Sequence, residues 1–265
     1  MTKSTLIRSM GLTALMAALA MGQSLASYIP QIADGGAWQT TIVVANTSTS
    51  TAFVSLNFYQ ETSGGATQNW NLAFQEGSAQ SLSLAGGVTK FLHTLGTDSA
   101  TSVGWAQVLA SGPGVEGVVA YAIFTQRIPG RTDQDGTASA AAGATRFLVP
   151  FDNSGGFITA VAVADYSSSG TINVNIQLDT GAISQGSFSI PAQGHASFGL
   201  PDRFPTTSGQ RGLAEFYVTG NGRETPQLSM LALRFNPTGA FTTAPVYGQS
   251  GSPIIGVIPP PTAKR

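Results

Sequence analysis

The chain has 265 residues and a formal net charge of −1, and only 9% of its residues are charged. This composition argues against the basic surface that nucleic-acid binding requires, and no polybasic amphipathic segment points to a membrane surface. Hydrophobic residues make up 42% of the chain, and the frequent Val, Ile, Thr and Phe argue against disorder. We therefore expect a folded protein whose polar surface is largely uncharged.

A secretory signal peptide is predicted over residues 1–26. Lys3 and Arg8 precede a short apolar stretch, and Ser24 and Ala26 occupy the small-residue positions of a cleavage site after Ala26. The apolar stretch is shorter than the roughly 20 residues of a membrane span, which also argues against the alternative of an uncleaved anchor. We therefore expect a secreted, periplasmic or outer-surface protein with no stable membrane span after cleavage. The chain has no cysteine, so this location brings no disulfides.

The remainder of the sequence is typical of short strands separated by turns. Residues 53–58 and 172–179 alternate between apolar and polar side chains, which indicates strands with one face on a core and one in water. Residues 40–46 and 159–165 are apolar on both faces, as central strands of a sandwich can be. Glycine-rich turns lie between such segments, and no amphipathic helix follows the signal peptide. The pattern predicts an all-β fold of antiparallel β-sandwich type.

The same sequence blocks occur twice in the same order. The glycine pairs Gly35–Gly36 and Gly155–Gly156 each precede an apolar strand and lie 120 residues apart. Matching blocks follow, among them GWAQV at residues 104–108 and GLAEF at residues 212–216. Several blocks in one order indicate an internal duplication. We therefore predict two tandem β-sandwich domains of the same fold, each of roughly a hundred residues.

The predicted boundaries follow from this repeat. The first sandwich spans residues 27–127 and the second spans residues 146–248. Residues 128–145, rich in Gly, Ala, Ser and Thr, are predicted to be a linker or a long loop. The Pro-rich tail, residues 249–265, contains the apolar segment PIIGVI. This segment either packs back on the second domain or is donated as a strand to another copy, in which case the chain would self-associate through its tail.

Two motifs of the first unit carry a resemblance to a known group of proteins. Residues 33–41 read ADGGAWQTT and residues 104–108 read GWAQV, and a Pro-terminated strand closes each unit. With these motifs the chain resembles uncharacterised secreted tandem β-sandwich-like repeat proteins of environmental bacteria. The second unit departs from the pattern, because Phe157 and Leu213 stand near where the first unit has tryptophans. The resemblance covers most of the mature chain and implies a β-sandwich-like module, but no catalytic residues.

The sequence contains no motif that selects a catalytic site. His93 and His195 follow the same strand block at comparable places, without the spacing of a zinc site and without a GxSxG nucleophile motif. The acidic residues are scattered singly, so no pair is selected for glycoside hydrolysis. We predict a non-enzymatic protein with a structural, adhesion or binding role. An extracellular hydrolase with a loop-assembled site, marked by His93 beside an acid and a serine, is a third hypothesis.

A partial calcium motif lies between the two units. Asp133 and Asp135 precede Gly136, and Ca²⁺ takes several oxygens from one tight turn. The later ligands of a full calcium loop are missing, and Asp and Gly also favour turns by themselves. We therefore predict no cofactor, with Ca²⁺ at Asp133 and Asp135 as the alternative.

Aromatic side chains are the candidates for ligand binding. Trp70 is flanked by Asn69 and Asn71, and a flat ring beside amide groups suits a neutral sugar. Trp38 and Trp105 lie in repeated blocks where the second unit has apolar residues, so we expect them in the core. The second hypothesis is therefore a carbohydrate-binding protein that uses Trp70, Asn69 and Asn71. Its partner would be a polysaccharide, whereas a structural role would involve an envelope or matrix protein.

Overall fold

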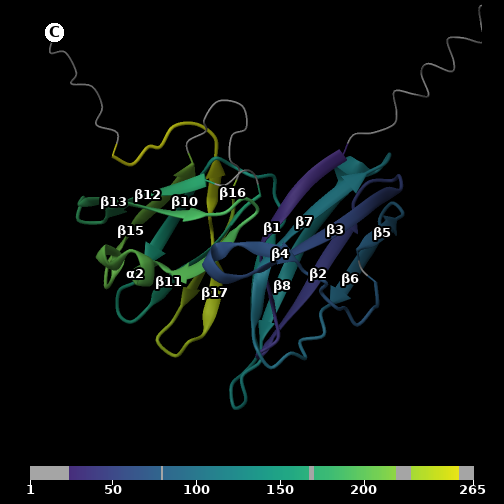
Figure 1. Cartoon of the computed structure of the whole chain (residues 1–265), viewed down its shortest axis with the longest axis horizontal. Helices are drawn as coiled ribbons and strands as arrows, with labels where there is room; N and C mark the ends of the chain where they lie inside the picture. Colours follow the sequence, from purple (N-terminus) through teal and green to yellow (C-terminus); the bar gives the residue numbers. More distant parts are fainter. Residues whose placement is uncertain (1–23, 79, 167–169, 219–227, 257–265) are drawn as a thin grey trace, which may run out of the picture.

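The computed structural model describes residues 24–78, 80–166, 170–218 and 228–256. Within these ranges the chain forms four antiparallel sheets, two from its first half and two from its second half (Figure 1). The prediction of an all-β fold is therefore confirmed. None of the helices in these ranges is long and apolar enough to cross a membrane. They are single short turns: α2 (Leu200–Arg203), η1 (Ser63–Gly65), η2 (Val115–Gly117) and η3 (Pro205–Thr207).

The first half of the chain forms a two-sheet sandwich. Its strands are β1 (Ser24–Asp34), β2 (Trp38–Asn46), β3 (Ala52–Glu61), β4 (Thr67–Asn69), β5 (Ser81–Leu84), β6 (Thr89–His93), β7 (Ser102–Ser111), β8 (Val118–Gln126) and β9 (Gln134–Ser139). One sheet has the order β1-β7-β3-β4, with β5 also paired to β3, and the other has the order β6-β2-β8-β9. The apolar faces of these two sheets meet in a common core.

The second half forms another two-sheet sandwich. Its strands are β10 (Arg146–Asp152), β11 (Ile158–Asp165), β12 (Gly170–Leu178), β13 (Ile183–Ile190), β14 (His195–Gly199), β15 (Arg211–Val218), β16 (Leu228–Phe235), β17 (Phe241–Ala244) and β18 (Tyr247–Gln249). The sheet orders are β13-β12-β15-β10-β18 and β14-β11-β16-β17. Strands β1-β7-β3-β5 and β6-β2-β8-β9 of the first sandwich therefore have counterparts in β10-β15-β12-β13 and β14-β11-β16-β17.

Alternating side chains produce the half-buried strands that the sequence predicts. In β3, Val54, Leu56 and Phe58 are buried in the first core, whereas the residues between them are exposed. In β12, Ile172 and Val174 lie in the second core, but Asn175 on the opposite face is buried as well, where it donates to the Ile255 carbonyl, so this face is not in water along its whole length. Successive side chains of a strand point to opposite faces, so one apolar set is enough to attach each strand to its core.

The same hydrogen-bonded turn occurs in both sandwiches, at a spacing one residue shorter than that of the glycine pairs. The Thr40 hydroxyl exchanges hydrogen bonds with the backbone of Ala33, and the Thr159 hydroxyl does the same with Asp152. Between these partners, Ala37 has a φ of 89° at the place where Gly156 has 82°. The two turns share a positive φ rather than a glycine. Ala37 adopts this φ although its Cβ makes the conformation less favourable than it is for glycine.

The two sandwiches pack directly against each other. The core of the first sandwich includes Ala162 of β11 and Leu231 of β16, which belong to the second half of the chain. Their neighbours Val161 and Ala232 point the other way, into the core of the second sandwich. Strands β11 and β16 are therefore apolar on both faces because each face is covered by a different core.

The prediction of a linker or a long loop at residues 128–145 is wrong for the central part of this segment. Residues Gln134–Ser139 form β9, which pairs with β8 at the edge of the first sandwich. The edge of β9 meets β17 of the second sandwich, where the Thr243 hydroxyl accepts from the Thr137 backbone N–H at 2.9 Å. The composition suggested a loop, but a strand forms because both neighbours supply hydrogen-bond partners.

The predicted signal peptide lies almost entirely outside the described residues. Residues 1–23 lie outside the described part of the chain, and β1 begins at Ser24. Ser24 pairs with Ser111 and Ala26 pairs with Leu109. Cleavage after Ala26 would therefore remove three exposed residues from the end of β1 and leave its buried part in place.

The described part of the C-terminal tail folds onto the second sandwich of the same chain. The carboxylate of Glu215, which is fully buried, accepts hydrogen bonds from the backbone N–H groups of Ile254 and Ile255 at 2.7 and 2.9 Å. Asn175 donates to the Ile255 carbonyl, and the Ile255 side chain is buried. A tail donated to another copy would first have to leave this site.

Candidate functional site

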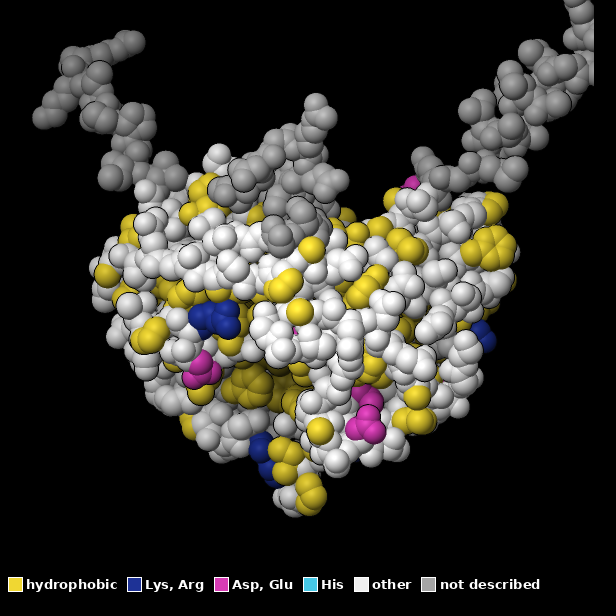
Figure 2. Space-filling view, in the orientation of Figure 1, with side chains coloured by type: hydrophobic (Ala, Val, Ile, Leu, Met, Phe, Trp, Pro, Cys, Tyr) yellow, Lys and Arg dark blue, Asp and Glu magenta, His cyan; other side chains and the backbone are white. Residues whose placement is uncertain are grey.

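A pocket of about 270 Å³ lies at the junction of the two sandwiches. Figure 2 shows a recess with a floor of hydrophobic side chains between the two halves of the molecule. Strands β1, β2, β7 and β8 of the first sandwich and β11, β14 and β16 of the second line the pocket. The lining residues are Gln31, Ala33, Trp38, Val103, Phe124, Ala160, Val161, Ala162, Ser197, Phe198, Gly199, Leu231, Leu233 and Phe235.

The apolar wall of the second sandwich follows from the pattern of β16. Leu231, Leu233 and Phe235 alternate with residues that face the second core, so they point toward the first sandwich. The run LSMLALRF of this strand is apolar on both faces. That double-sided pattern is the sequence signal that could have indicated a covered outer face.

The wall of the first sandwich is aromatic. The Trp38 ring lies 6.1 Å from the Phe124 ring and 5.7 Å from the Phe241 ring, measured between centroids. Trp38 is only partly buried, because one side of it borders the pocket. The expectation of a simple core tryptophan at this position is therefore incomplete.

One buried polar atom in the pocket wall lacks a hydrogen-bond partner. Gln31 of β1 is only 9% exposed, and its Oε1 has no partner. An unpaired buried amide oxygen costs roughly 1–3 kcal/mol. None of the side chains that line the pocket is charged.

His195 holds the two sandwiches together beside this junction. Its ring is fully buried, with Nδ1 2.7 Å from Glu61 Oε2 and Nε2 3.1 Å from the Pro30 carbonyl oxygen. Both partners belong to the first sandwich. A doubly protonated ring donates to both oxygens, whereas a neutral ring can donate to only one.

Trp105 is buried, but outside the sandwich core where we expect it. Its neighbours Ala106 and Val108 face the first core, so the Trp105 side chain points to the outer face of its sheet. There it stacks on Tyr59 with 4.2 Å between centroids and donates from Nε1 to the Gln193 carbonyl oxygen at 2.9 Å. Gln193 belongs to the second sandwich, so Trp105 is a junction residue.

The two histidines do not occupy equivalent places. His93 lies opposite Thr41 at the end of β6, whereas His195 lies opposite Ala164 at the start of β14. His93 is partly exposed and pairs with Glu76. The prediction that the two histidines occupy comparable places is therefore wrong, because they lie at opposite ends of counterpart strands.

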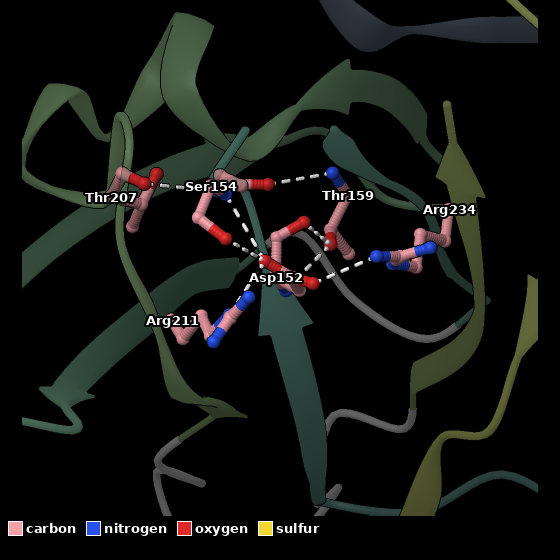
Figure 3. Close-up of polar contacts among 7 residues, drawn as sticks. Asp152, Ser154, Thr159, Thr207, Arg211 and Arg234 are labelled. Carbon is pink, nitrogen blue, oxygen red and sulfur yellow. Dashed lines mark hydrogen bonds and ion pairs between the residues drawn. The ribbon is translucent and has the colours of Figure 1, made fainter. Parts of the chain in front are cut away.

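Asp152, at the end of β10, links the two sheets of the second sandwich (Figure 3). Its carboxylate accepts from Arg211 of β15 at 3.1 Å and from Arg234 of β16 at 2.7 Å. The Ser154 hydroxyl donates to it at 2.6 Å. The Ser154 hydroxyl and then the Arg234 guanidinium hold the pKa of Asp152 below its ordinary range. Both carboxylate oxygens thus have hydrogen-bond partners, and the carboxylate has a structural role.

In the described residues of the first sandwich, the counterpart of Asp152 is Ala33, which has no carboxylate. Asp34 lies at the counterpart of Asn153, one position beyond the counterpart of Asp152. Its carboxylate accepts from the Gly96 backbone N–H at 3.1 Å. Burial raises the pKa of Asp34 above its ordinary value, although the Thr94 hydroxyl and this N–H oppose the shift.

The predicted sugar site lies on the first sandwich and does not line the junction pocket. The ring of Trp70 is partly buried against the first core. Asn69 and Asn71 on either side of it are exposed. The three residues are adjacent as predicted, but the tryptophan offers less surface than a freely exposed ring.

The two acids of the calcium motif have protein partners. Asp133 forms an ion pair with Arg127, with 3.1 Å between Oδ2 and Nε, and Asp135 accepts from the Thr125 hydroxyl at 2.6 Å. Across the described ranges, no three His, Asp or Glu side chains form a group that could hold a metal ion. Geometry therefore adds no support to a Ca²⁺ site here.

No protein-family model, curated protein or solved structure matches the chain. A function has to be argued from the chemistry of the site, because folds of this kind host many functions.

Proposed function

We propose that the chain is a secreted or surface-exposed, non-enzymatic binding protein whose site is the junction pocket. The observation that carries this proposal is that the pocket needs both sandwiches. Ligand pockets are typically concave and mainly apolar, with a few polar groups, and often lie between domains. At about 270 Å³ the pocket is near the lower end of their size range of roughly 300–1,000 Å³, so it suits a small ligand.

A non-catalytic role fits the use of the titratable groups. Asp152 is held by two arginines and a serine, and His195 is held by Glu61 and a backbone carbonyl. None of these six side chains belongs to the pocket wall. A hydrolase would need an acid or base directed at its substrate.

An internal duplication would explain how the pocket arose. The matched strand orders and the matched hydrogen bonds of Thr40 and Thr159 support such an origin. The signal-like residues 1–26 support export, which would place the pocket outside the cell. We propose the internal duplication and the export of the protein together with the binding function.

A cavity-filling variant tests the proposed site. Ala160 is half-buried in the pocket wall, so Ala160→Phe should fill the pocket. Ala182→Phe, at an exposed turn, is the matched control. A panel of small apolar molecules should raise the melting temperature of the wild type and of the control, but not of Ala160→Phe. Equal responses in all three proteins would place binding elsewhere.

A second candidate function, polysaccharide binding, is favoured by a different surface. Phe91 and Tyr121 are 51% and 36% exposed, and both lie opposite Val43 on the outer face of β6-β2-β8-β9. They are two strand spacings apart, roughly 10 Å. Exposed hydroxyls of Thr137 and Ser139 lie on neighbouring β9. Aromatic rings on a flat, weakly charged face can stack on sugar rings.

Pull-down on insoluble polysaccharides separates this surface from the site predicted by sequence. Loss of binding in the Phe91→Ala, Tyr121→Ala double variant, but not in Trp70→Ala, would assign the sugar to the sheet face. The opposite pattern would assign it to Trp70 with Asn69 and Asn71. A folded wild type that binds no polysaccharide would eliminate this second function.

A further inference from the structure

We propose that the junction pocket selects small, uncharged, mainly apolar molecules that carry one hydroxyl group, and that Gln31 recognises this hydroxyl. The inference rests on the proposed binding function and adds the chemical class of the ligand. It depends on three features of the pocket: its aromatic wall, its lack of charge and its single unpaired amide.

The wall determines the body of the ligand. Trp38, Phe124 and Phe235 supply rings, and Leu231 and Leu233 supply aliphatic surface. Flat aromatic or alicyclic molecules bury apolar area against such a wall, and aromatic rings gain further from offset or edge contacts. The volume of about 270 Å³ limits the ligand to a small one.

The absence of charge in the wall excludes ionic ligands. None of the lining side chains is a Lys, Arg, Asp, Glu or His. A carboxylate or ammonium group entering this wall would lose its hydration without gaining an ionic partner. Fatty acids, sugar acids and amines therefore do not fit.

The amide of Gln31 determines the polar group. Gln31 is nine-tenths buried, and its Oε1 lacks a partner. Rotation about the last side-chain bond, which is broad for Gln, can present either oxygen or nitrogen to the pocket. A hydroxyl can both donate and accept, so it pairs with either orientation. A carboxamide would bring more polar atoms than one Gln side chain can satisfy.

The other polar groups in the wall are placed differently. Ser197 is exposed, so its hydroxyl keeps contact with water when the pocket is filled. The indole of Trp38 can only donate. Gln31 is thus the buried group that gains most from a ligand hydroxyl.

Equilibrium dialysis of the full chain with three matched probes tests the inference. The probes are naphthalene, 2-naphthol and 2-naphthoate, which share one ring system and differ in a single group. We expect 2-naphthol to bind about tenfold more tightly than naphthalene, as one added hydrogen bond allows, and 2-naphthoate to bind more weakly than both.

A variant of Gln31 assigns the preference to this residue. Gln31→Met keeps the length of the side chain and removes its amide, so 2-naphthol should fall to the affinity of naphthalene. Naphthalene itself should bind as before, which also reports that the variant is folded. Gln177→Met, at an exposed position, is the control and should keep the preference.

The outcomes separate the two proposals. Equal binding of naphthalene and 2-naphthol to the wild type would overturn the inference and leave the pocket as a binding site. Tightest binding of 2-naphthoate, or an unchanged preference in Gln31→Met, would also overturn the role of Gln31. Binding of no probe would count against both the hydroxyl preference and the proposed function.

Discussion

The two sandwiches share one strand order but close their cores in different ways. The second core consists of residues from the second half of the chain alone. The first core is completed by Ala162 and Leu231, with Leu233 and Phe241 packed beside them. The first sandwich thus depends on the second for part of its core. The pocket lies where residues of the second sandwich do not completely cover the first core.

Separating the halves should have the largest effect. We expect residues 143–256 to unfold cooperatively as an isolated chain, because their core needs no outside residue. Residues 24–142 should lack a cooperative transition, since the apolar side of Trp38 and Phe124 would be open to water. Thermal unfolding followed by circular dichroism would check both chains. A cooperative transition in the first half alone would show that the closure is not required.

Substituting the two histidines should sharpen the same contrast. His195→Ala removes a buried ring from between Glu61 and the Pro30 carbonyl, so it should cost about 2–4 kcal/mol of unfolding free energy. His93→Ala, at the partly exposed pair with Glu76, should cost less than about 0.5 kcal/mol. Urea denaturation of the full chain measures both. Equal costs would mean that His195 does not hold the junction.

The two acids at the ends of β1 and β10, Asp34 and Asp152, should change stability in opposite directions when they are substituted. Asp152→Ala leaves Arg211 and Arg234 without their carboxylate and should cost about 2–3 kcal/mol. Asp34→Asn should raise stability at neutral pH, because it removes a buried charge and keeps an oxygen for the Gly96 N–H. The second sandwich already has Asn153 at the counterpart position. A loss of stability in Asp34→Asn would show that its charge is needed.

The pH dependence of stability follows from the pKa shifts of Asp152 and Asp34. The folded pKa of Asp152 lies below its ordinary value of 3.8, so its contribution is complete above that pH and is lost as the pH falls through the folded pKa. The folded pKa of Asp34 lies above 3.8, so this group lowers stability as the pH rises through that value. Between pH 3 and pH 7, the unfolding free energy of Asp152→Ala should therefore fall less steeply as the pH decreases than that of the wild type. The unfolding free energy of Asp34→Asn should rise more steeply as the pH increases.

The smallest effect concerns the turn that precedes β2 and β11. Ala37 has the positive φ that Gly156 has in the second sandwich, so Ala37→Gly should stabilise the chain by about 1 kcal/mol. Gly156→Ala should destabilise it, since the added Cβ would also lie 3.2 Å from Pro237 Cγ. Melting temperatures of the two variants measure both signs. Destabilisation by Ala37→Gly would mean that this Ala makes contacts worth more than its strain.

Local patterns were sufficient to predict several of the strands but not their partners. The alternation of Val54, Leu56 and Phe58 indicates a half-buried strand because the side-chain period of a strand is two. The glycine pairs that suggested a repeat are one residue out of step with the matching hydrogen bonds of Thr40 and Thr159, because the two turns share a positive φ at Ala37 and Gly156 rather than a glycine. Residues 134–139 look like a loop by composition and become β9 because β8 and β17 lie beside them.

By itself the sequence determined the β class and the small number of charged side chains. Only the tertiary structure decided that β11 and β16 serve two cores, that His195 meets Glu61 across 134 residues, and that Gln31 borders a pocket. The physical reason is that a strand's pattern specifies which of its faces is apolar. What covers that face depends on contacts between residues far apart in the chain.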